Sequence, residues 1–146
     1  TGVQTCALPI CSKLFSEWVL QDASRAHPEL QHVILRYFNV AGADPRERLG
    51  QNNPNATHLI KVACQAALGI RDHVSIFGAD YPTADGTGVR DFIHVSDLAD
   101  IHVRALEYVE RERCSQILNC GYGRGYSVRQ IIEAVRRAPG VELLPQ

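Results

Sequence analysis

Residues 32–38 read HVILRYF, a short and nearly continuous apolar run that a polar loop follows. A run of this length and composition is typical of a parallel strand that is buried on both faces. In residues 12–26, Leu14 and Trp18 stand at helical spacing, and Pro28 ends that pattern. Helix, turn and buried strand in this order predict an α/β fold with a wound, parallel sheet.

Downstream of this strand, loops alternate with short regular elements. Residues 39–54 are predicted to form a long loop at the carboxyl end of the strand, where open α/β sheets bind their ligands. We expect Asn55 to cap a helix over residues 56–68. The later elements, in order, are predicted as a strand over residues 74–78, a strand over 89–95, a helix capped by Ser96, a strand over 116–120, and a helix that opens with a capping box of Ser127 and Gln130.

Composition excludes several classes of protein. The 146 residues carry a formal net charge of −1, so no basic stripe suggests a nucleic-acid partner, and no apolar run is long enough to span a membrane. The five cysteines are odd in number and form no C-x-x-C pair, which favours reduced thiols and a cytoplasmic location over a disulfide framework. The six histidines are scattered, and we predict no metal site.

The first ten residues, TGVQTCALPI, have no usable hydrophobic period and no positive charge. We interpret residues 1–10 as a non-native leader that resembles the translation of a sequencing-library adapter, and exclude them from the fold prediction. The chain contains no methionine, and its tail, VELLPQ, has no pattern of a natural ending. We therefore expect the sequence to be a fragment.

Three polar residues are candidates for ligand binding from their positions alone. Asn39 follows the buried strand, and Asn55 stands at an expected helix start, where backbone N–H groups favour anions. Arg90 follows a flexible Gly-Thr-Gly, and its planar guanidinium suits a phosphate. Each also has a structural interpretation: the asparagines as turn and cap residues, and Arg90 as a surface residue paired with Asp85 or Asp91.

Five longer strings carry a specific resemblance. They are SKLFSE, LRYFNVAGADP, PNATHLIKVACQAALG, SIFGADYPTADGTGVRDFIHVSDLADIHVRALEY and LNCGYGRGYSVRQIIEAV. They resemble, without gaps from about Ser12 to Val135, the carboxyl half of the UDP-glucose 4-epimerases, which belong to the extended short-chain dehydrogenase/reductases of the NAD-dependent epimerase/dehydratase family. The resemblance implies part of an NAD-binding Rossmann fold and part of a smaller carboxyl-terminal substrate-binding domain.

The resemblance also implies a reaction and a catalytic pair. Such enzymes interconvert UDP-glucose and UDP-galactose through a 4-keto intermediate and transient NADH, and they act as homodimers. Lys13 matches the lysine of the family's Tyr-x-x-x-Lys pair, in which the ammonium favours the tyrosinate and holds the nicotinamide ribose. The tyrosine position is occupied by Pro9, and the 146 residues hold no glycine-rich dinucleotide loop. The chain as it stands is therefore expected to be inactive.

Further site residues follow from the resemblance. Tyr37 and Phe38, together with Lys13, are implied to bind NAD. The implied UDP-sugar contacts are Asn39, Asn55, Ala56, Ser75, Ile76, Phe77 and Arg90, with Ser75–Phe77 lining the uracil pocket and Arg90 on the diphosphate. The preference between hexose and N-acetylhexosamine is not readable, because the residues that set it in the family lie past Gln146.

The same resemblance predicts an organisation in five segments. These are the leader (1–10), the end of the Rossmann domain (11–40), a substrate-binding region (41–95), a helix and strand that return to the Rossmann domain (96–120), and a substrate-domain helix (121–146). Two alternatives stay open: a fragment of another nucleotide-sugar epimerase or dehydratase, and a non-catalytic fragment that binds UDP.

Overall fold

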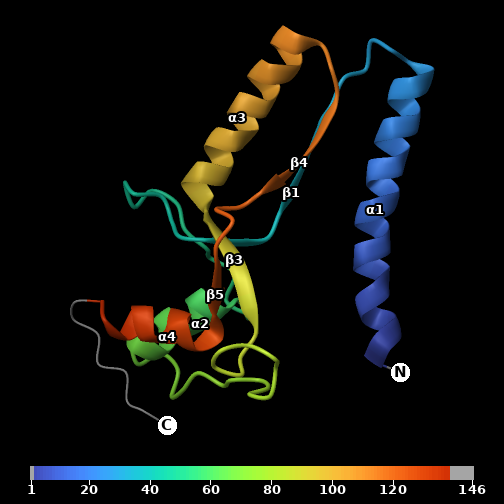
Figure 1. Ribbon diagram of the computed structural model, residues 1–146. Coiled ribbons are helices and arrows are strands. Elements are labelled where there is room, and N and C mark those ends of the chain that lie inside the picture. The colour runs from blue at the N-terminus through green and yellow to red at the C-terminus, as the bar shows by residue number, and fades with distance from the viewer. Residues whose placement is uncertain (1, 139–146) are drawn as a thin grey trace. The chain divides into compact units, whose positions relative to one another are not determined.

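The computed structural model describes the backbone of residues 2–138 and the side chains of residues 9–138. Within this range the elements are α1 (Gly2–Ala26), β1 (Val33–Tyr37), β2 (Asn39–Ala41), α2 (Leu59–Ala67), β3 (Val89–His94), α3 (Val95–Glu112), β4 (Gln116–Cys120), β5 (Gly125–Ser127) and α4 (Val128–Arg136) (Figure 1). The chain divides into two compact units. The first unit is Thr1–Arg36 with Ala99–Asn119, and the second is Tyr37–Leu98 with Cys120–Gln146.

The first unit contains α1, the body of α3 and a two-stranded sheet of β1 and β4. A polar cluster fastens these elements where α1 ends and the strands begin. The His32 backbone N–H donates to Ser115 Oγ at 3.1 Å, and Ser24 Oγ lies 2.8 Å from His32 Nδ1. The carbonyl of His32 accepts from the Gln116 N–H at 3.0 Å, so one residue links α1, β1 and β4.

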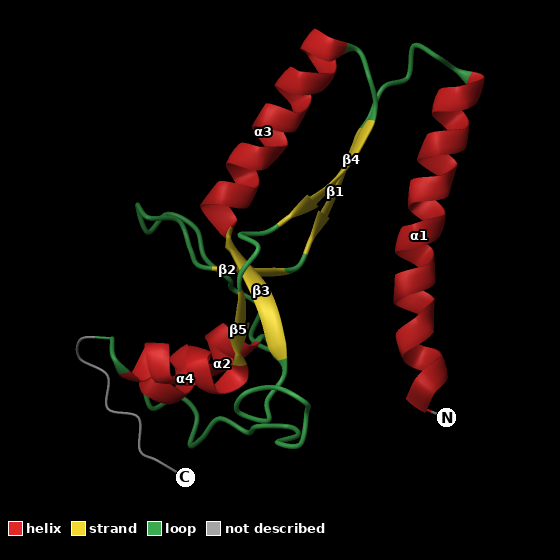
Figure 2. Cartoon of the chain, in the orientation of Figure 1, coloured by secondary structure: helices red, strands yellow, loops and turns green. Residues whose placement is uncertain are grey.

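The second unit contains a three-stranded sheet in the order β2-β3-β5, with α2 and α4 side by side (Figures 1 and 2). Strand β2 runs parallel to β3, with Asn39 opposite Phe92, whereas β5 runs antiparallel to β3, with Tyr126 opposite Arg90. The core is small. Its buried apolar residues are Ala56, Ala63, Ala66, Ile93, Leu98 and Cys120.

Local sequence explains where α4 and α3 begin. The capping box predicted for α4 is confirmed, because Ser127 accepts from the Gln130 N–H while the Gln130 side chain accepts from the Ser127 N–H. The prediction that Ser96 caps α3 is wrong. The helix begins at Val95, and the ring Nδ1 of His94 accepts the Ser96 N–H at 3.2 Å, so the imidazole takes the capping role.

Four further expectations are corrected. Strand β1 is only partly buried, and Tyr37 at its end is 50% exposed, because its sheet has just two strands among the described residues. Residues 74–78 form no strand, since no described segment pairs with them. Helix α1 begins at Gly2 rather than residue 12 and carries Pro9 within it. Helix α2 begins at Leu59, three residues later than expected.

Candidate functional site

Asn39 and Arg90 share one face of the three-stranded sheet. Arg90 and Phe92 lie two residues apart on β3 and therefore point to the same side, and Asn39 is the register partner of Phe92 on β2. Tyr126, opposite Arg90 on β5, belongs to this face as well. The fold thus brings together two of the three polar candidates that the sequence indicated.

Arg90 itself lies on the surface. Its guanidinium Nη1 donates to the carbonyl of Val89 at 2.8 Å. The interpretation of Arg90 as half of a salt bridge with Asp85 or Asp91 is wrong for the described part of the chain, because both carboxylates bind other groups. A guanidinium held only by its neighbouring carbonyl retains donors for an anionic ligand.

Asp85 organises the loop that leads into β3. Its carboxylate accepts from the Thr87 N–H at 2.9 Å and from Thr87 Oγ1 at 2.7 Å, and Ser127 Oγ donates to its other oxygen. These bonds, from Ser127 first and then from Thr87, lower the pKa of Asp85. Thr87 is fully buried, and Gly86 has a φ of 76°, a value that favours glycine. The segment before Arg90 is therefore anchored to the cap of α4.

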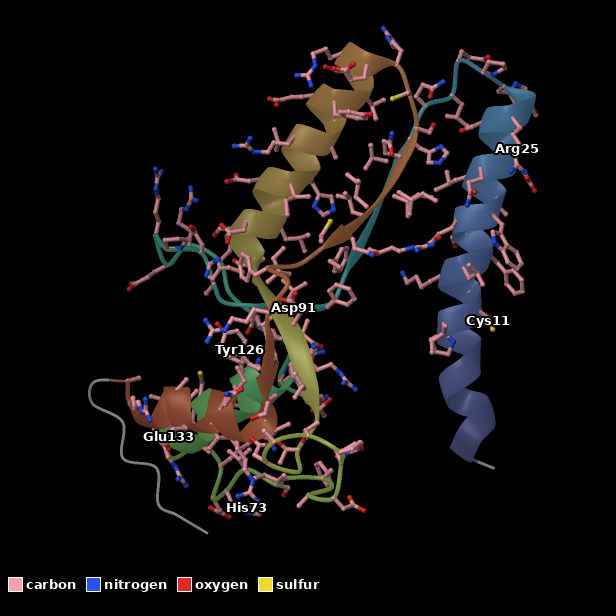
Figure 3. The ribbon with its side chains drawn as sticks, viewed as in Figure 1. Cys11, Arg25, His73, Asp91, Tyr126 and Glu133 are labelled. Atoms are coloured by element: carbon pink, nitrogen blue, oxygen red, sulfur yellow. The ribbon has the colours of Figure 1, made fainter. Side chains whose placement is uncertain are left out.

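Asp91 anchors the opposite face of β3 to the turn that follows β4 (Figure 3). Its carboxylate accepts from the Tyr122 N–H at 3.3 Å and from the Gly123 N–H at 2.9 Å. The Tyr122 hydroxyl donates to Asp97 and accepts from the His94 N–H at 3.2 Å. The bond to Asp97 raises the pKa of Tyr122, so this phenol is held protonated as a structural donor.

A cavity of about 790 Å³ opens on the sheet face that carries Asn39 and Arg90. Four of its lining residues lie on that face, Ile93 comes from the opposite face of β3, and the others come from the turns and from α4, on which Glu133 is labelled in Figure 3. Its lining consists of Ala41, Asp85, Phe92, Ile93, His94, Tyr122, Tyr126, Arg129, Gln130, Ile131, Glu133, Ala134 and Arg137. None of the predicted site residues is among them.

Asn55 and Ala56 lie in the loop before α2 rather than at its start. The N-cap of α2 is His58, so the argument that Asn55 stands beside free helical N–H groups is wrong. The backbone N–H of Asn55 instead donates to Asn53 Oδ1 at 3.0 Å, which closes a tight turn around Pro54. Ala56 is 3% exposed, so it offers a ligand little more than its backbone.

The predicted uracil segment, Ser75–Phe77, lies between α2 and β3 and after His73 (Figure 3). Phe77 is 89% exposed and Ile76 is 40% exposed, so among the described residues these side chains are not enclosed. An exposed ring can stack on a base, and backbone groups outside helices and strands can hydrogen-bond it. Their role in binding uracil stays a prediction.

Lys13 lies exposed on α1 in the first unit, one turn before Glu17. Glu17 forms a two-bond ion pair with Arg36 of β1, in which Arg36 Nε donates to Glu17 Oε1 at 2.8 Å. The pair lowers the pKa of Glu17 and fixes the rotation of α1 against β1. Residues four apart share a helical face, so Lys13 lies on the face that meets the strand, and Pro9, four residues before Lys13, has no side-chain hydrogen-bond donor.

Tyr37 and Phe38 fit a flat aromatic ring such as a nicotinamide. Both are about half exposed, at 50% and 55%, and therefore offer ring faces. Gly121 keeps space open beside Phe38, since a Cβ at that position would lie 3.3 Å from Phe38 Cδ2 and would press on the Asp91 carboxylate. The residues present are thus compatible with the predicted cofactor.

Among residues 9–138, no group of three or more His, Cys, Asp or Glu side chains could hold a metal ion. No helix within the described residues is both long and apolar enough to cross a membrane. Cys11, Cys64, Cys114 and Cys120 form no disulfide within the described part of the chain.

The site residues that the sequence missed are those that anchor the strands. Asp85, Asp91 and Tyr122 each bind groups far away in the sequence, and their roles depend on pairings that a local pattern does not reveal. The only local signal was the capping box at Ser127, whose hydroxyl also bonds Asp85.

A family model described as the NAD dependent epimerase/dehydratase family matches residues 10–121. The chain belongs to this family. Its α/β architecture agrees with solved members, which confirms the predicted fold class and NAD as the family's cofactor.

Particular relatives are named UDP-glucose 4-epimerase. The chain is 58% identical, over 132 residues, to the one from Azospirillum brasilense, a match that covers 90% of this chain and 38% of the relative. The crystal structure of UDP-glucose-4-epimerase from Stenotrophomonas maltophila with bound NAD and formylated UDP-arabinopyranose aligns with a TM-score of 0.85 and 40% identity, covering 89% of this chain and 39% of that one.

A second structure, the UDP-glucose 4-epimerase from Bifidobacterium longum in complex with NAD+ and UDP, aligns with a TM-score of 0.84 and 40% identity. The match covers 91% of this chain and 40% of that one. The chain therefore spans well under half the length of these relatives.

Proposed function

We propose that this chain is part of a UDP-glucose 4-epimerase, and that it contributes the UDP-binding side of the site and the lysine of the catalytic pair. The observation that carries the proposal is the 58% identity to such an enzyme over 90% of the chain. The exposed guanidinium of Arg90, on the sheet face it shares with Asn39, supports a contact with the diphosphate.

The remaining predicted residues divide between substrate and cofactor. Asn39, Asn55, Ala56 and Ser75–Phe77 hold the UDP-sugar, and Tyr37 and Phe38 contact the nicotinamide. Lys13 holds the nicotinamide ribose and favours the ionised phenol of a tyrosine one turn earlier. Bound NAD would supply reversible oxidation at C4 of the hexose, which gives the 4-keto sugar and then the epimer.

The residue at position 9 favours a second, more limited function, namely ligand binding without catalysis. Pro9 lies inside α1 at the position of the catalytic tyrosine, so no phenol stands four residues before Lys13. We propose that this chain binds UDP without turning over the sugar. The lack of disulfides among the described cysteines supports a reducing, cytoplasmic location, and the exposed Phe15 and Trp18 of α1 support a homodimer of the intact enzyme.

A titration of the chain with UDP, followed by calorimetry, tests the binding proposal. Arg90→Gln removes the phosphate donor and is expected to weaken binding by about 10- to 100-fold, as for one charged hydrogen bond. Arg104→Gln on α3 is the control for the loss of one positive charge and should leave affinity unchanged. The absence of any UDP binding to the unmodified chain would overturn the proposal, and formation of UDP-galactose from UDP-glucose would overturn the inactivity.

A further inference from the structure

The loop of residues 51–56, which carries the proposed UDP contacts Asn55 and Ala56, is held by a single cation. Lys61 Nζ donates to the carbonyl of Gln51 at 2.8 Å and to the carbonyl of Asn53 at 2.7 Å. The Asn53 carbonyl also accepts the Ala56 N–H at 3.3 Å. The ammonium therefore ties two points of the loop to the first turn of α2.

Two other side-chain hydrogen bonds stabilise this loop, but neither binds its carbonyl groups. Gln51 Nε2 donates to His58 Nδ1 at 2.7 Å, and Asn53 Oδ1 accepts the Asn55 N–H at 3.0 Å. Both bonds are local and exposed. Among the contacts of residues 9–138, only those of Lys61 join the loop carbonyls to the helix body, where its neighbours Ala63 and Ala66 are buried.

The position of Lys61 is not one that helix formation selects. It is the third residue of α2, and the positive end of the helix dipole disfavours a cation in the first turn. The chain has only two lysines among its 15 basic residues. A compact ammonium on a flexible stem can aim separate N–H donors at two carbonyls, whereas a guanidinium presents its donors in a fixed planar fork.

We propose that Lys61 is a positioning residue that holds the loop of residues 51–56 in the shape in which it contacts the UDP-sugar. The proposal rests on the proposed function, since that function places the ligand at this loop. Lys61 itself does not contact the ligand; it acts through the two carbonyls and the turn around Pro54.

The test compares the unmodified chain with Lys61→Met, which keeps the length and helix preference of the side chain but removes its donors. Hydrogen–deuterium exchange at the backbone amides of residues 51–56 is expected to accelerate, while exchange in α2 and α4 stays unchanged. UDP affinity, measured by calorimetry, is expected to fall by about tenfold. Arg104→Met is the matched control and should change neither quantity.

The outcomes separate the two proposals. If the unmodified chain binds no UDP, the proposed function fails and the positioning role fails with it. If the unmodified chain binds UDP and Lys61→Met binds it equally well, only the positioning role is overturned. Unchanged exchange in the loop also overturns it. Loss of protection throughout α2 would show that Lys61 supports the helix rather than the loop, and would overturn it too.

Discussion

Replacing Ser127 by alanine removes one hydroxyl that serves two elements. Ser127 Oγ accepts the Gln130 N–H at 3.1 Å at the start of α4 and donates to the Asp85 carboxylate in the loop before β3. Ser127 is buried, so water does not take over these bonds in the folded chain. Loss of the cap alone destabilises a protein by about 1 kcal/mol. The lost bond to Asp85 adds to this cost.

The effect of Ser127→Ala depends on pH in a defined direction. Ser127 is the largest cause of the lowered pKa of Asp85, whose ordinary value is 3.8. A carboxyl with a lowered pKa stabilises the fold above its unfolded pKa, and this stabilisation is lost as the pH falls through its folded pKa. The variant is therefore most destabilised near neutral pH. The difference in unfolding free energy between Ser127→Ala and the unmodified chain should become smaller below pH 3.8.

Urea denaturation followed by circular dichroism, at neutral pH and at about pH 3, measures both effects. Gln130→Ala is the matched control, because it removes only the bond to the Ser127 N–H at 2.9 Å and leaves Asp85 intact. We expect Gln130→Ala to lose less unfolding free energy than Ser127→Ala, and to lose the same amount at neutral and at low pH. An equal loss for both variants at both pH values would refute the coupling between the cap of α4 and the loop of Asp85.

Three other predictions follow from single residues. Ile93→Ala should lower the free energy of unfolding by about 2–5 kcal/mol, because Ile93 is 2% exposed in the core of the second unit; a loss below 1 kcal/mol in urea titrations would contradict this burial. A thiol-reactive dye should label Cys11 rapidly and Cys120 only on unfolding, since burial raises the pKa of Cys120; equal rates in native buffer would argue against it. Arg36→Gln should raise the pKa of Glu17 toward its ordinary value of 4.5, which NMR titration of the carboxyl carbon can measure, with Arg25→Gln as the control.

Periodicity and local chemistry predicted the elements that depend on neighbours in the sequence. The strand over residues 89–95, the helix after it and the capping box at Ser127 were each predicted from a few adjacent positions, and each element is present, although β3 ends at His94. The helix starts at α3 and α2 were misplaced because a histidine ring caps one, and a histidine with no side-chain cap precedes the other.

Long-range pairing explains what the sequence did not reveal. Residues 74–78 have the composition of a strand, but a strand also needs a neighbouring strand to pair with. No described segment pairs with these residues. Asp85 and Asp91 are close to Arg90 in the sequence, but the Asp85 carboxylate binds Ser127, 42 residues away, in addition to the nearby Thr87, and the Asp91 carboxylate binds Gly123, 32 residues away. Asn39 and Arg90 are 51 residues apart in the sequence, and the register of β2 and β3 shows that they share a face.

The two compact units interleave along the chain, which limits how the protein can be divided. The backbone passes from one unit to the other near residues 36, 98 and 119, and the second of these crossings lies inside the continuous helix α3. Neither unit can thus be produced as one uninterrupted segment. A protease cut near residue 98 divides both units, whereas a cut near residue 36 divides only the first unit and a cut near residue 119 divides only the second. Recombination that exchanges either unit between relatives would have to replace two separate stretches together.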